Sequence, residues 1–146
     1  MPGFPATFIR PMSASTLPDI HDPADIRRLV DTFYARVRGD DLLAPVFASR
    51  VSDDHWPAHL DTITRFWTAV LLTQGAGYRG NPGDQHLYLP IEAAHFTRWL
   101  ALFGQTVDAM FAGDHASEIQ VRALKMAEMF QAKMAVARAG GGLSIL

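Results

Sequence analysis

The sequence predicts an all-α protein. Apolar side chains recur every three or four residues in four stretches, the spacing that builds one face of a helix. No stretch alternates apolar and polar residues for long enough to predict a strand, and no segment repeats another. Prolines and glycines separate the stretches, where they end helices.

The first predicted helix begins at Asp22. Four prolines interrupt residues 1–21, so this segment is predicted to be an extended tail. Asp22 is a suitable N-cap, and Pro23 suits the first helical position because its missing N–H costs nothing there. Gly39 ends the helix, whose apolar face consists of Ile26, Leu29, Val30, Phe33, Tyr34 and Val37.

Three further helices are predicted after a corner at residues 40–49, where Pro45 prevents a long helix. Asp54 is expected to cap the next helix, with Pro57 in its first turn. Glycines between 75 and 83 then break regular structure, and the last two helices follow Pro90 and Asp114. The folded domain is predicted over residues 22–138, with a flexible tail over 139–146. Periodicity alone fits both a plain bundle and a pocket around a cofactor.

Composition excludes several classes of function. A chain of 146 residues forms one domain, so any electron donor is expected to be a separate molecule. The formal net charge of -2 provides no basic surface for nucleic acid. The absence of cysteine excludes disulfides, thiolate metal sites and c-type haem attachment, and it fits a reducing compartment. No leader peptide and no apolar run of membrane-spanning length is present, so a cytoplasmic protein is predicted.

His59 and His86 are the most informative pair of residues, because the two rings are candidates to face a single iron. His59 begins an apolar helical stretch, and His86 follows the glycine-rich segment. His95 competes with His86 as a ligand, although a role at the start of its helix explains it equally well.

Tyr34 and Trp99 lie on apolar helix faces and carry polar groups that need partners when buried. For Tyr34, a hydrogen bond to a backbone carbonyl is the ordinary explanation, and donation to a bound ligand is the functional one. Core packing is the ordinary explanation for Trp99.

Zinc chemistry and nucleotide chemistry have weaker support. His55 and His59 are four residues apart, which is a spacing used by zinc sites, but no third ligand is evident and Pro57 disturbs the shared turn. No nucleophile elbow, phosphate loop or dinucleotide fingerprint is present.

Five separated runs resemble, in order, the group III truncated haemoglobins, which are bacterial globins with a two-over-two helical sandwich around haem. The resemblance extends from about Asp22 to Arg138 and rests on the runs FYARVRGDDLLAPVF, HLDTITRFW, GYRGNPGDQHLYLP, HFTRWLALF and TVDAMFAG.

The resemblance implies a role for each candidate residue. His86 is the proximal ligand of the haem iron, and Tyr34, His59 and Trp99 face the bound ligand on the distal side. The remaining cofactor contacts that we expect are Phe47, Ile63, Phe66, Trp67, Tyr78 and Arg79, the last two as partners of the haem carboxylates.

The resulting prediction is a haem b protein that binds O2, NO and related diatomic molecules. Several convergent donors slow ligand release, so redox or detoxification chemistry is expected rather than O2 transport. An activity on NO or peroxide would need an external electron donor. The alternatives are a helical interaction module without a cofactor and a zinc hydrolase using His55 and His59.

Overall fold

The computed structural model describes residues 16–73 and 91–140, and this part of the chain contains helices but no strand. The elements in chain order are α2 (Pro23–Arg38), α3 (Ala44–Ala48), the 3-10 turn η2 (Asp53–His55), α4 (Trp56–Leu72), α6 (Ala93–Met110) and α7 (Asp114–Gly140). The all-α prediction is confirmed.

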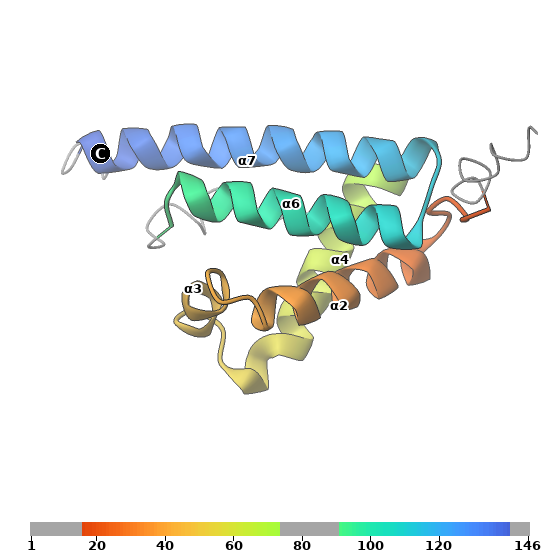
Figure 1. Cartoon of the computed structure of the whole chain (residues 1–146), viewed down its shortest axis with the longest axis horizontal. Coiled ribbons are helices and arrows are strands. Elements are labelled where there is room, and N and C mark those ends of the chain that lie inside the picture. The colour runs from red at the N-terminus through yellow and green to blue at the C-terminus, as the bar shows by residue number, and fades with distance from the viewer. Residues whose placement is uncertain (1–15, 74–90, 141–146) are drawn as a thin grey trace, which may run out of the picture.

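The four long helices form a two-over-two sandwich. Helix α2 packs against α4 and α6, and α7 packs against α6 and contacts α4. Figure 1 shows α6 and α7 side by side along one edge of the molecule, with α2 below them and α4 crossing behind. Among the described residues, no helix is long and apolar enough to cross a membrane. The predicted cytoplasmic location stays a prediction.

The start of α2 is as predicted, whereas the start of α4 is not. The Asp22 carboxylate accepts the backbone N–H of Asp25 at 2.9 Å, and Pro23 occupies the first helical turn. The prediction that Asp54 caps α4 is wrong, because Asp54 lies inside η2 and α4 begins after it, at Trp56. The N-cap position belongs to His55, which makes no side-chain capping bond, and Pro57 lies in the first turn as expected.

The corner at residues 40–49 contains the short helix α3, and a buried carboxylate ties it to α6. Asp40 accepts the backbone N–H groups of Leu42 and Leu43 at 3.1 and 3.0 Å and pairs with Arg98 at 2.7 Å. The Arg98 guanidinium and these two N–H groups outweigh desolvation and hold the pKa of Asp40 below its ordinary value. This network fixes the wall that carries Phe47 relative to the helix that carries Trp99.

Stacked aromatic rings join α2, α4 and α6. Phe103 stacks on Trp99 with ring centroids 5.2 Å apart and on Trp67 with centroids 5.8 Å apart. Phe33 of α2 meets Trp99 and Phe103 edge-on at 5.1 and 5.0 Å. Edge-to-face and offset ring contacts add about 0.5–1.5 kcal/mol each beyond the burial of their area, so this cluster stabilises the crossing of the helices.

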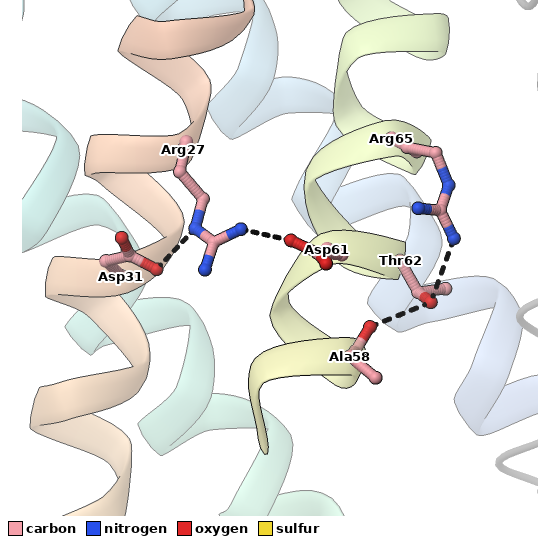
Figure 2. A network of polar contacts seen from close by, with 6 residues as sticks. All are labelled: Arg27, Asp31, Ala58, Asp61, Thr62 and Arg65. Carbon is pink, nitrogen blue, oxygen red and sulfur yellow. Dashed lines mark hydrogen bonds and ion pairs between the residues drawn. The ribbon is translucent and has the colours of Figure 1, made fainter. Parts of the chain in front are cut away.

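On the surface, Arg27 bridges α2 and α4 by pairing with Asp31 of its own helix and Asp61 of α4 (Figure 2). All three side chains are more than a third exposed. Exposed ion pairs contribute about 0–1 kcal/mol, so the aromatic cluster, rather than this bridge, holds the two helices together.

The packed part of the chain begins before Asp22, the boundary that the prolines predicted. Ile20 is fully buried, and the Asp19 carboxylate accepts the backbone N–H groups of His115 and Ala116, both at 2.9 Å, at the start of α7. Gly113 lies directly beneath Asp19 with φ of 139°, and a Cβ there would come within 2.5 Å of the carboxylate carbon. The N-terminal segment therefore caps the last helix.

We expect Asp19→Ala to lower the free energy of unfolding by about 1–2 kcal/mol, because it leaves the first turn of α7 without its acceptor. Burial raises the pKa of Asp19, but the N–H groups of His115, Ile20 and Ala116 outweigh it and the pKa is lowered. This contribution is therefore complete above the unfolded-state pKa of about 3.9 and is lost as pH falls through the folded-state pKa. Urea denaturation at pH 7 and near pH 3 measures both effects.

The control for Asp19→Ala is Asp31→Ala, which removes an exposed carboxylate from the middle of a helix. We expect it to change stability by no more than about 0.5 kcal/mol. Equal losses for the two variants at pH 7 would contradict the capping role of Asp19.

Candidate functional site

A cavity of about 350 Å³ is lined by side chains from all four long helices, α2, α4, α6 and α7. Its volume falls in the range of roughly 300–1,000 Å³ that is typical of sites for small molecules and cofactors. Its lining is mostly apolar and comes from α2, α3, α4, α6, α7 and the connections around them. The lining residues are Tyr34, Val46, Phe47, Arg50, Val51, His59, Thr62, Ile63, Phe66, Trp67, Ile91, His95, Phe96, Trp99, Ala123, Met126, Ala127 and Phe130.

The structure places every predicted site residue that it describes on this cavity. Helix α2 supplies Tyr34, α3 supplies Phe47 and α6 supplies Trp99, while α4 supplies His59, Ile63, Phe66 and Trp67. Tyr78, Arg79 and His86 lie outside the described residues. The assignments of these three residues therefore stay predictions from the sequence.

Tyr34 and Trp99 bring two polar groups together at the cavity. Burial raises the pKa of the Tyr34 phenol well above its ordinary value, and a hydrogen bond with Trp99 offsets this only in part. Because an indole N–H can only donate, the phenol oxygen is its acceptor. The phenol therefore keeps its proton, and within the described part of the chain no backbone carbonyl is found to accept it.

His59 lies beside Tyr34, with ring centroids 6.3 Å apart and the planes at 78°. Trp56, one turn earlier in α4, is 4% exposed and meets both rings, at 5.3 Å from His59 and 5.9 Å from Tyr34. The Arg38 guanidinium lies 4.7 Å above the Trp56 ring and pairs with Asp53. Trp56 thus packs against both polar rings and restricts their movement.

Thr62 is a further hydroxyl on the cavity wall, but it is already engaged. Its Oγ1 donates to the carbonyl of Ala58 at 3.1 Å and accepts from Arg65 at 3.4 Å (Figure 2). The other polar side chains on this side of the cavity are those of Tyr34, Trp99 and His59.

His95 lines the cavity, but it is unsuited to bind a metal. Its Nδ1 accepts the backbone N–H of Glu92 at 2.9 Å in a capping box at the start of α6, which is the cap-region role that the sequence allowed. In a neutral imidazole that accepts at Nδ1, the proton resides on Nε2. His95 therefore presents a donor, whereas a metal needs a lone pair.

The structure gives the zinc hypothesis no support. His55 lies in η2, where its Nδ1 contacts the Ser52 hydroxyl, whereas His59 packs against Trp56 and Tyr34. Among residues 16–73 and 91–140, no group of three metal-ligating side chains comes together.

Sequence reasoning missed three parts of the site. Trp56 was assigned no role, although its spacing of three from His59 was a usable signal. Met126 and Phe130, which line the cavity from α7, were not predicted as site residues. Arg50, which supplies a cation at the cavity, had no signal at all, because it follows α3 in an irregular segment.

Comparison with known proteins agrees with this geometry. Residues 19–135 match the model of the family described as bacterial-like globin. The group 3 truncated haemoglobin ctb of Campylobacter jejuni is 35% identical over 109 residues, which cover 73% of this chain and 85% of that protein. The crystal structure of a group III truncated haemoglobin from Campylobacter jejuni superposes with a TM-score of 0.72 at 32% identity, covering 79% of this chain and 92% of that one.

A two-over-two helical sandwich around one aromatic-lined cavity defines the truncated globin class. The chain belongs to the bacterial-like globin family, within its group III truncated haemoglobins. Family membership supports a haem-binding protein for small diatomic ligands. It argues against the alternative prediction of a helical interaction module without a cofactor.

Proposed function

We propose that this protein binds O2 and NO at a haem b and uses them in redox or detoxification chemistry rather than in O2 transport. The observation that carries the proposal is the buried Tyr34 hydroxyl at the cavity, which keeps its proton and receives the Trp99 N–H. We propose that an external molecule supplies the electrons for this chemistry.

The cavity residues fit a haem. Its apolar walls from α3, α4 and α7 suit a porphyrin face, and Arg50 provides a positive charge of the kind that a carboxylate requires. Haem supplies the iron at which the diatomic ligand binds. We assign Phe47, Ile63, Phe66 and Trp67 to contacts with the porphyrin.

On the distal side, this chain's own residues stabilise the charge that a diatomic ligand acquires on binding. The Tyr34 hydroxyl donates to the ligand, while Trp99 donates to the Tyr34 oxygen and so polarises that O–H bond. Hydrogen bonds in such a water-poor site are worth more than in bulk water, and they slow ligand release. His59, partly buried and packed against Trp56, adds a third polar group at the cavity wall.

We assign the proximal position to His86. The assignment rests on its place in the family motif and on the engagement of His95 Nδ1 with Glu92, which removes the competing histidine.

The absorption spectrum of the purified haem-loaded protein tests the cofactor and its ligand together. We expect an intense Soret band in the wild type, its loss or a strong shift in His86→Ala, and a near-normal spectrum in His95→Ala. Added imidazole should restore the band in His86→Gly, because it replaces the missing ring, and this recovery separates ligand loss from failure to fold. A normal band in His86→Ala with a lost band in His95→Ala would reverse the assignment.

The redox role is tested by mixing the O2-loaded protein with NO in the presence of a chemical reductant. Slow O2 release together with catalytic loss of NO supports the proposal. Rapid O2 release without NO consumption would favour transport.

A further inference from the structure

The outward side of α7 carries exposed apolar side chains. Val121, Leu124, Met129 and Val136 are 50%, 48%, 41% and 69% exposed, and they are four of the five large exposed apolar residues in the described part of the chain. Figure 1 shows α7 along the edge of the molecule, with its other side on α6. Concentration on one helix is typical of an interaction surface, whereas scattered exposed residues need no explanation.

These residues are distinct from the buried face of the same helix. The buried face repeats at helical spacing through Ile119, Ala123, Ala127, Phe130, Met134 and Ala137. A surface helix of a globular protein normally carries polar residues opposite such a face. Here the opposite side combines apolar residues with two charged ones. We call it the outer face; it consists of Val121, Leu124, Lys125, Glu128, Ala132 and Val136, and Met129 lies at its edge.

Two opposite charges in the middle of the outer face make it complementary to a second copy of itself. Lys125 and Glu128 are exposed and one turn apart, and neither takes part in the ion pairs found among residues 16–73 and 91–140. Two copies of α7 packed antiparallel about a twofold axis place Lys125 opposite Glu128 of the partner subunit, and symmetry creates this pair twice. The same register sets Val121 opposite Ala132 of the partner subunit. Parallel packing would bring like charges together, which disfavours it.

We propose that the outer face of α7 is the self-association surface of this protein and binds a second copy of the chain in antiparallel orientation. The stripe from Val121 to Val136 is only about 22 Å long at 1.5 Å per residue. Such a helix pair buries less than the roughly 1,000 Å² of a stable interface. The dimer is therefore weak and depends on protein concentration, and it leaves the haem cavity on the other side of α7 accessible.

Sedimentation velocity of the haem-loaded full chain between about 10 µM and 1 mM tests the proposal. We expect the wild type to shift from monomer to dimer across this range. Lys125→Glu and Glu128→Lys should each weaken association roughly tenfold or more, because each brings two like-charge pairs together. The double variant K125E/E128K should recover it, since the opposite charges meet again.

Arg122→Glu makes the same change of charge beside the outer face and should leave association unchanged. Circular dichroism and the Soret band confirm that each variant is folded. A wild type that stays monomeric at the highest concentration overturns the proposal and leaves the face to a different partner. A double variant that associates no better than the single variants overturns the antiparallel register.

Discussion

Replacing Tyr34 with phenylalanine should speed O2 dissociation roughly 10- to 100-fold, because a hydrogen bond to a charged acceptor contributes about 1.5–3 kcal/mol. The ring contacts with Phe33, Phe47 and Trp56 survive the change, so only the hydroxyl is lost. Stopped-flow displacement of O2 by CO measures the rate. The same variant should consume NO more slowly in each turnover if bound O2 is the reacting species.

Trp99 can partly compensate for the loss of the Tyr34 hydroxyl in the O2 dissociation measurement. When the phenol oxygen is gone, the indole N–H loses its acceptor and is free to turn toward the ligand. The double variant Tyr34→Phe/Trp99→Phe should therefore release O2 faster than the product of the two single effects predicts. Simple multiplication of the two effects would show that the two side chains act independently.

Thr62→Val is the matched control for Tyr34→Phe, since it also removes a hydroxyl from the cavity wall. That hydroxyl is bonded to Ala58 and Arg65, so O2 dissociation should change less than about twofold. An unchanged O2 rate in Tyr34→Phe itself would show that Tyr34 is not the donor.

Local rules were sufficient for most of the fold. Asp22, Pro23 and Gly39 delimit α2 because capping and φ constraints act within one turn. Asp54 failed as a cap because a 3-10 turn precedes α4, and its local hydrogen bonds compete with the expected start. Ile20 and Asp19 could not be assigned to the core, because their partners lie about 95 residues away in α7.

The sequence predicted which residues form the site, but not how they are arranged in space. The family motif named Tyr34, His59 and Trp99, but their meeting at one cavity depends on how three helices cross. The unsuitability of His95 as a ligand depends on a single hydrogen bond from Glu92, which sequence spacing permits but does not establish. Arg50 lies at the cavity through the path of the chain after α3, for which no sequence pattern exists.

Phe33→Ala should be the most destabilising single change near the site. Phe33 is 1% exposed, and its ring lies 4.7 Å from Tyr34 and about 5 Å from both Trp99 and Phe103. Truncating a buried phenylalanine costs about 3–5 kcal/mol, through lost burial and the cavity left behind. Urea denaturation followed by far-UV circular dichroism measures the loss, and Phe33→Leu, which retains most of the volume, should lose about 1.5 kcal/mol or less.

The same variant connects packing to ligand binding. Phe33 supports the rings of Tyr34 and Trp99 from behind, so its truncation gives both donors room to move away from the ligand. At temperatures where Phe33→Ala remains folded, O2 should dissociate faster, although no polar atom has been removed. Asp31→Ala, an exposed change on the same helix as Phe33, should alter stability by no more than about 0.5 kcal/mol and leave O2 release unchanged. A destabilised Phe33→Ala with wild-type O2 release would show that the rest of the pocket, with Trp56 behind Tyr34, is sufficient to hold the donors in place.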